Sequence, residues 1–173
     1  MSDKPIKHKH REAWNIAGHS HYLTFSTLHR RKYLLEERIC FLLARRINKA
    51  AKKLNFAVLA YVFMPDHVHI LIHPMNEIYD MSKILQAIKQ GPSRSAKNRK
   101  WISTDLWEPG GGHDSNIYNA KARQNCILYI LQNPVRKGFV EASWDYRWSS
   151  ANWYVHGVEG DIECHFITEL WQD

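Results

Sequence analysis

Cysteine is scarce in this sequence, and its spacing excludes two common kinds of small protein. The three cysteines, Cys40, Cys126 and Cys164, are far apart, odd in number and never form a CxxC pair. A disulfide framework needs paired cysteines, and a zinc knuckle needs closely spaced thiolates. The sequence therefore predicts three reduced thiols, most of them buried.

Long hydrophobic runs are also missing. The longest candidate, residues 63–72, is interrupted by Asp66, His67 and His69. It falls short of the roughly 18 apolar residues that a membrane span needs. The first 14 residues are charged and contain no apolar stretch typical of a secretory signal. We therefore expect no membrane association and a cytoplasmic location.

Acidic residues are few in the first 100 positions. These hold 7 of the 17 Asp and Glu but 19 of the 24 Lys and Arg, a net charge of +12, whereas residues 101–173 carry −5. A basic surface suits phosphate groups, although basic proteins of other kinds are common. Five acidic residues and no Lys or Arg follow His156, so we expect one domain over residues 1–156 and an acidic tail over 157–173.

The order of hydrophobic patterns predicts the α+β fold class. With 173 residues, 45% of them hydrophobic, the chain can form one core and is not globally disordered. The patterns predict strands near 20–29, 56–61, 62–73 and 115–118, helices at 36–55, 81–88 and 121–131, a helix break or kink at Gly91-Pro92, and a glycine-rich loop at 107–112. The first six elements give a ferredoxin-like (RRM-like) antiparallel sheet with helices on one face, to which the third helix and the tail are appended.

Two histidines in one strand are the sharpest local feature. His67 and His69 follow Met64-Pro65-Asp66, and residues two apart on a strand share a face at roughly 6.6 Å. They can converge on one metal ion. Hydrogen-bonded or exposed histidines are the alternative, but burying two unpaired imidazoles is costly, which favours the metal. His73 is a weaker candidate near the strand's end, and we expect Asp66 to cap the turn.

A second feature lies on the third helix, where Tyr129 and Asn133 are four residues apart. At this spacing a phenol and an amide project side by side. A tyrosine at the edge of an apolar face is more often a packing residue than a nucleophile, so this pair alone indicates no chemistry.

Taken together, these motifs resemble a known family. The segment MPDHVH at 64–69, followed by YILQNPVRKGFV at 129–140, resembles the single-tyrosine HUH transposases of bacterial insertion sequences. It is more closely similar to their REP-associated tyrosine transposase branch, which GGGHD at 110–114 and WDYRWSSA at 144–151 also match. The resemblance spans roughly residues 14–155. The sequence departs from the pattern at Asp66, where the family often has Asn, and at His113, where relatives more often have an aromatic residue.

The resemblance implies a function and a site. The protein would be a metal-dependent endonuclease and strand transferase, a transposase acting on single-stranded DNA with a REP-like hairpin, and it would be nucleoid-associated. His67, His69 and Asn133 would hold a divalent ion, Mg²⁺ or Mn²⁺, and Tyr129 would form a covalent 5′-phosphotyrosine intermediate. The match of residues 139–154 to the REP-associated branch favours a monomer over a dimer.

Basic residues would then contact DNA phosphates. We expect this role for the outer side of the first helix and for Arg30, Arg31, Lys32, Arg94, Lys97, Arg99, Lys100, Arg136 and Lys137. The acidic tail would shield this surface, so deleting residues 157–173 should strengthen single-strand binding.

Two other functions stay open. A non-catalytic RRM-like nucleic-acid-binding module would explain the charge but would leave His67, His69 and Tyr129 unexplained. A metal hydrolase acting on a small substrate through both histidines and Asp66 would explain the histidines but not the basic surface.

Overall fold

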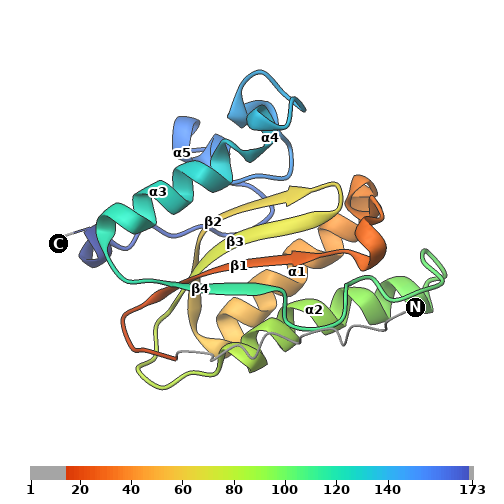
Figure 1. Cartoon of the computed structure of the whole chain (residues 1–173), viewed down its shortest axis with the longest axis horizontal. Coiled ribbons are helices and arrows are strands. Elements are labelled where there is room, and N and C mark those ends of the chain that lie inside the picture. The colour runs from red at the N-terminus through yellow and green to blue at the C-terminus, as the bar shows by residue number, and fades with distance from the viewer. Residues whose placement is uncertain (1–14, 172–173) are drawn as a thin grey trace, which may run out of the picture.

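A four-stranded antiparallel sheet forms the centre of the molecule, whose computed structural model describes residues 15–171 (Figure 1). Its strands lie in the order β2-β3-β1-β4. Their bounds are β1 Ser20–Ser26, β2 Phe56–Met64, β3 His67–Pro74 and β4 His113–Ile117. Helix α1 (Glu37–Leu54) connects β1 to β2, and helix α2 (Met81–Asn98) connects β3 to β4. The predicted ferredoxin-like order is confirmed.

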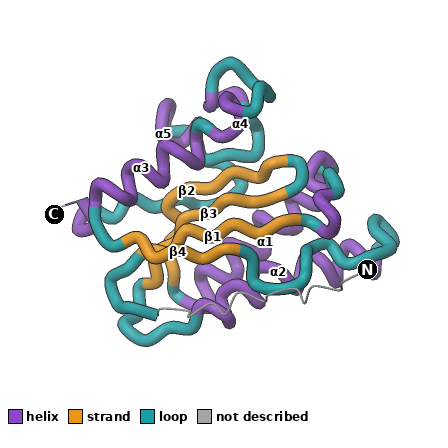
Figure 2. Tube along the Cα trace, in the orientation of Figure 1, coloured by secondary structure: helices purple, strands orange, loops and turns teal. Residues whose placement is uncertain are grey.

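Helices cover both faces of the sheet, as Figures 1 and 2 show. Helices α1 and α2 pack on one face, where the core includes Phe25, Leu43 and Ile70. Helix α3 (Ala120–Leu131) lies across the other face and packs Ile127 and Ile130 against β2 and β3. The prediction of two helices on one face and an appended third helix is confirmed.

The amphipathic pattern of α1 explains its position and its end. Ile39, Leu43 and Ile47 are spaced four residues apart and buried on the sheet. The helix stops where Asn55 adopts a left-handed conformation, with φ of 52°. Asparagine tolerates this conformation better than most residues, so it is a suitable C-cap.

Helix α2 corrects one prediction, because it runs unbroken through Gly91-Pro92. Its buried residues continue at four-residue spacing from Ile88 through Pro92 to Ala96. Packing of this stripe on the core therefore outweighs the cost of a proline inside the helix. Residues 93–98 of the basic run after Pro92 thus belong to the helix, and Arg99 and Lys100 lie just beyond it.

Other boundaries differ by a few residues. Strand β1 stops at Ser26, and the chain turns through short 3₁₀ helices at Leu28–Arg30 and Tyr33–Leu35. Beyond α3, the chain forms the short helices α4 (Asn133–Arg136) and α5 (Ala151–His156), with further 3₁₀ turns at Ser143–Asp145 and Thr168–Trp171.

The acidic tail packs on the fold along β2 and α1. The amide of His165 donates to the Val58 carbonyl at 2.9 Å, and Ile162 is buried. The carboxylate of Asp161 lies 2.5 Å from Arg147, and that of Glu163 lies 3.6 Å from Lys52. These acids pair with Lys52 of α1 and with Arg147, so the expected shielding of DNA-binding residues by the tail stays a prediction. Asp173 lies outside the described residues.

Within residues 15–171, none of the helices combines the length and the hydrophobicity of a membrane span.

Candidate functional site

The alternation of β3 sends its two histidines to the face that α3 crosses. Val68 and Ile70 point into the α1 and α2 core, so His67 and His69 point the other way. The turn that precedes them is anchored to β1, because the amide of Thr27 donates to the Asp66 carbonyl at 2.9 Å.

The two imidazoles converge. The Nε2 atoms of His67 and His69 are 3.1 Å apart, and the rings are nearly perpendicular at 88°. The Nδ1 atom of His67 donates to the Asp66 carboxylate, 2.5 Å away. The Nδ1 atom of His69 is within hydrogen-bond distance of the hydroxyls of Tyr22 at 2.7 Å and Thr24 at 2.9 Å. Each ring is therefore held at Nδ1 and presents Nε2 to the same point, as metal-ligating histidines do.

Burial sets the protonation of this site. Burial, followed by the positive charges of His67, Arg136 and Arg30, lowers the pKa of His69 to about 3. The ring is thus neutral at pH 7, which is the form that coordinates a metal. Burial also raises the pKa of Tyr22 to about 12, so this phenol keeps its proton beside His69.

Helix α3 places Tyr129 beside the histidines. Its ring centroid lies 5.7 Å from that of His69 and 6.1 Å from that of Tyr22, in edge-to-face contact with both. The side chain of Tyr129 is still 43% exposed, so a DNA strand can reach it. The guanidinium carbon of Arg136 lies 4.1 Å from the ring centroid, and its Nη2 donates to the Tyr129 carbonyl at 3.2 Å.

Asn133 carries an unused acceptor. Its side chain is only 3% exposed, and its buried Oδ1 has no hydrogen-bond partner among the described residues. Asn133 begins α4, two residues after the end of α3, which carries Tyr129. A buried amide oxygen without a partner is costly and fits a role as a cation ligand.

The residues of this site fit a divalent ion only if the side-chain amide of Asn133 takes part. Over residues 15–171, no group of three or more His, Cys, Asp or Glu side chains is arranged to hold a metal. The paired Nε2 atoms of His67 and His69 would supply two ligands, and the partnerless oxygen of Asn133 would be the candidate for a third. Such a set leaves coordination positions open for phosphate oxygens.

The proposed DNA-binding residues are all exposed, but only some of them lie at this site. Arg30 lies 3.6 Å from Asp66, and Arg136 covers Tyr129. The exposed set comprises Arg30, Arg31, Lys32, Arg94, Lys97, Arg99, Lys100, Arg136 and Lys137. The four from Arg94 to Lys100 lie at or just beyond the end of α2, where Lys97 pairs with Asp105 at 3.0 Å and Arg99 stacks on Trp101.

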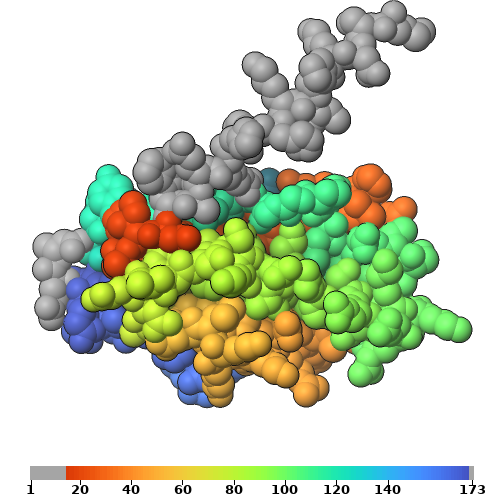
Figure 3. Space-filling view, turned by 90° about the horizontal axis from the view of Figure 1, so that it is seen from below, coloured from red at the N-terminus to blue at the C-terminus, as the bar shows by residue number. Residues whose placement is uncertain are grey.

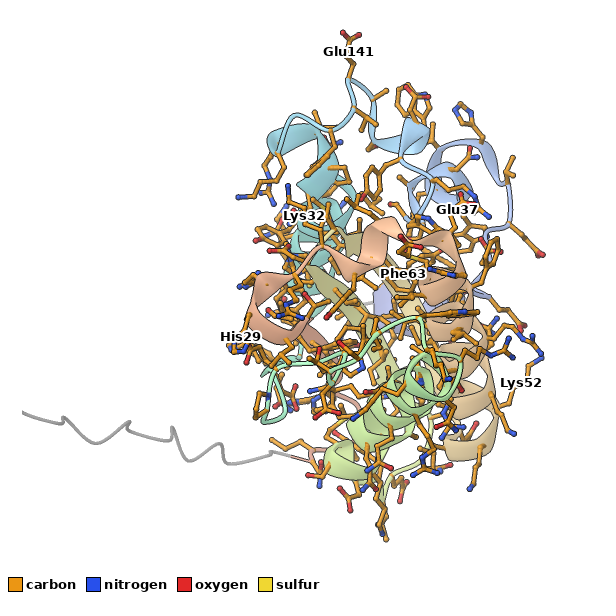
Figure 4. All side chains as sticks on the ribbon, turned by 90° about the vertical axis from the view of Figure 1, so that its right-hand side faces the viewer. His29, Lys32, Glu37, Lys52, Phe63 and Glu141 are labelled. Atoms are coloured by element: carbon orange, nitrogen blue, oxygen red, sulfur yellow. The ribbon has the colours of Figure 1, made fainter. Side chains whose placement is uncertain are left out.

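The segment that follows β1 is hydrogen-bonded to the segment that follows α2. The hydroxyl of Tyr33 lies 3.0 Å from that of Thr104, and the amide of Leu28 donates to the Leu106 carbonyl. In Figure 4, His29 lies on the opposite side of the molecule from Lys52 of α1. The basic residues of the sequence therefore belong to more than one surface.

Tyr22 and Thr24 were not predicted as site residues from the sequence, and Asp66 makes a different contact from the predicted one. Tyr22 and Thr24 have the two-residue spacing of a strand face, but only the β1–β3 register, which pairs Thr24 with His69, brings them to the site. The carboxylate of Asp66 binds His67 instead of capping the turn. His73 lies farther along β3, where its Nδ1 is 3.1 Å from the hydroxyl of Ser20.

Gly112 closes the glycine-rich loop onto β1. Its φ of +82° is in the left-handed region, and a Cβ there would overlap the carbonyl oxygen of Thr24. Glycine is therefore required at this point. The next residue, His113, pairs with Thr24 across the β1–β4 ladder, so the loop joins the sheet beside the histidine pair.

Comparisons with known proteins show which proteins this chain is similar to. The family described as "Transposase IS200 like" matches residues 16–115. A solved structure described as the REP-associated tyrosine transposase bound to a REP hairpin is 22% identical, with a TM-score of 0.70, and the match covers 97% of this chain and 94% of that chain. A putative transposase from Deinococcus radiodurans R1 is 19% identical, with a TM-score of 0.47, and the match covers 66% and 88% of the two chains. None of the curated proteins matches the chain.

Proposed function

The chain belongs to the IS200-like transposase family, and from that membership we propose that it cleaves and rejoins single-stranded DNA through a covalent phosphotyrosine. The observation that carries this proposal is the contact of Tyr129 with His69, 5.7 Å between ring centroids, beside two Nε2 atoms 3.1 Å apart. A nucleophile next to a cation site is the arrangement that phosphoryl transfer requires.

The covalent step is a transesterification. The Oη atom of Tyr129 attacks the scissile phosphorus, an Oη–P bond forms, and the P–O3′ bond breaks. The phenolic proton is lost to solvent, and the departing 3′ oxygen takes up a proton. The 5′-phosphotyrosine keeps the energy of the broken ester, so a second 3′-OH can reverse the step without a nucleotide cofactor.

The residues around Tyr129 support this step. His67, His69 and Asn133 would hold Mg²⁺ or Mn²⁺, which when bound would polarise the scissile phosphate. Asp66, Tyr22 and Thr24 fix the two imidazole rings through Nδ1. Arg136 places positive charge against the Tyr129 ring, where attack on a phosphate creates negative charge.

Hairpin DNA of the REP type is the proposed substrate. Support comes from the fold, which matches that of the transposase bound to a REP hairpin over 97% of this chain. Further support comes from exposed cations beside the site, among them Arg30 and Arg136. Because α3 packs on β2 and β3 of its own chain, the site needs no second copy, which supports a monomer.

A cleavage assay tests the proposal. The protein is incubated with a single-stranded hairpin oligonucleotide and Mn²⁺ and analysed by denaturing electrophoresis. We expect a covalent protein–DNA adduct that disappears in Tyr129→Phe. An adduct that survives in Tyr129→Phe would overturn the assignment of the nucleophile, and Mn²⁺ binding that is unchanged in His67→Ala/His69→Ala would overturn the metal site.

A further inference from the structure

A basic groove lies between α1 and α2 on the surface turned away from the sheet. It has a volume of about 380 Å³ and is lined by Arg46, Lys49 and Lys53 of α1 and by Lys83, Gln86 and Gln90 of α2. Figure 3 views this side of the molecule, where α1 (orange) and α2 (yellow-green) lie side by side. Every polar side chain of the lining can donate hydrogen bonds, and no carboxylate is among them.

The cations of α1 form a row. Arg46, Lys49 and Lys53 are three and four residues apart, so they share one face of the helix and span about 10 Å along its axis. Within residues 15–171, no carboxylate lies within ion-pair distance of Lys49 or Lys53. Lys83 faces Asp80, 3.7 Å away, at the mouth of the groove. The row is therefore a concentration of charge that the fold leaves uncompensated.

Arg46 is held in place by α2. Its Nε donates to the carbonyl of Ala87, and its side chain passes so close to Gly91 that a Cβ there would lie 2.9 Å from the Arg46 side chain. The absence of a side chain at position 91 thus makes room for the arginine.

The groove is separate from the site at Tyr129. Helices α1 and α2 cover one face of the sheet, whereas His67, His69 and Tyr129 lie on the other. The sheet and a helical layer about 10 Å thick therefore stand between them. A ligand in the groove is not the segment of strand that reaches Tyr129.

We infer that the groove binds the phosphate backbone of base-paired DNA. Unpaired DNA is typically bound on aromatic rings, but the lining of the groove contains no aromatic residue. Cations and amides contact phosphates without reading bases, which suits a duplex segment. This inference rests on the proposed function only in taking DNA as the ligand, and it gives the protein a second DNA-binding surface.

Binding assays in EDTA test the groove independently of cleavage. The double variant Lys49→Gln/Lys53→Gln is titrated with a blunt 20-base-pair duplex and with unpaired oligothymidine at several salt concentrations. The control, Lys121→Gln, removes a lysine from an exposed position outside the groove and outside α1. We expect the groove variant to bind duplex more weakly, with a salt slope shallower by about 1.8. Its binding to oligothymidine should match that of the control.

Two outcomes would overturn the inference. One is duplex binding equal to that of the control, and the other is an equal loss of duplex and oligothymidine binding, which would indicate general electrostatic attraction. Thermal unfolding of both variants at the wild-type temperature establishes that they fold. Because EDTA prevents metal-dependent cleavage, failure of the Tyr129 mechanism leaves this result unaffected, and loss of duplex binding leaves the cleavage assay unaffected.

Discussion

The hydroxyl of Tyr22 lies 2.7 Å from Nδ1 of His69, and the two rings stack at an interplanar angle of 12°. Tyr22 also contacts Tyr129. One side chain from the central strand therefore orients a proposed metal ligand and packs against the proposed nucleophile. This double contact gives Tyr22 a positioning role that can be measured.

We expect Tyr22→Phe to weaken Mn²⁺ binding by about 10-fold to 100-fold, because the ring of His69 loses a hydrogen bond that fixes its orientation. Calorimetric titration with Mn²⁺ measures this change. Tyr118→Phe, at an exposed position just after β4, should bind Mn²⁺ like the wild type. Equal Mn²⁺ affinity in all three proteins would contradict the positioning role.

Arg136→Gln should slow covalent adduct formation by about 100-fold, since the guanidinium over Tyr129 stabilises charge that develops during attack. Single-turnover kinetics at saturating DNA separate this effect from weaker binding. Lys121→Gln, near the start of α3, serves as the control. A change in apparent DNA affinity with an unaltered single-turnover rate would show that Arg136 only binds substrate.

Gly112→Ala should destabilise the fold by more than Gly110→Ala. Both glycines have φ above +80°, but only a Cβ at position 112 meets the backbone of Thr24. The backbone strain common to both costs about 1 kcal/mol, and the overlap adds about 1–3 kcal/mol at position 112. Urea unfolding measures the difference, and equal destabilisation would show that the close approach to Thr24 is unimportant.

Ile162→Ala should lower the free energy of unfolding by about 2–5 kcal/mol, because this side chain of the tail is buried in the core. Val158→Ala, at a half-exposed position of the same segment, should change the free energy of unfolding by only about 0.5 kcal/mol. Deleting residues 157–173 should accordingly destabilise the protein. A truncated protein with unchanged stability and stronger DNA binding would contradict this packing role and support the shielding hypothesis.

Acid should destabilise the protein partly through His73. Burial, followed by the charges of Arg123 and His21, lowers the pKa of His73, so the folded state favours the neutral ring. An unfolded histidine has a pKa of about 6.5, so below that pH the unfolded state binds more protons and stability falls. Urea unfolding at pH 7.5 and 5.5 should show a smaller loss in His73→Gln than in the wild type. An identical loss in both proteins would contradict this assignment, and exposed His165→Gln is the control.

Local patterns in the sequence were sufficient to predict the ferredoxin-like order and the shared face of His67 and His69. Both follow from periodicity within one element. Tyr22 was missed because its contact with His69 depends on the β1–β3 register, which joins residues 47 positions apart. Helix α2 was predicted too short because the burial of Pro92 and Ala96 on the core is invisible in local propensity.

The contacts of the tail could not be predicted from the sequence either. Its composition indicated an acidic segment, but charge alone does not say which cations it meets. Asp161 pairs with Arg147, and the backbone of residues 164–165 pairs with β2, through contacts that only the folded chain defines. Similarly, the sequence does not show that the side-chain oxygen of Asn133 is buried without a hydrogen-bond partner, because this depends on how the folded chain packs around it.

In the proposed mechanism, the packing of α3 on its own sheet also determines how the reaction depends on protein concentration. Tyr129, His67 and His69 belong to one chain and meet through contacts within that chain. Each molecule that binds a DNA strand therefore carries a complete set of reacting groups. Dilution reduces how often DNA is captured, but the rate of cleavage by a molecule already bound to its strand stays constant.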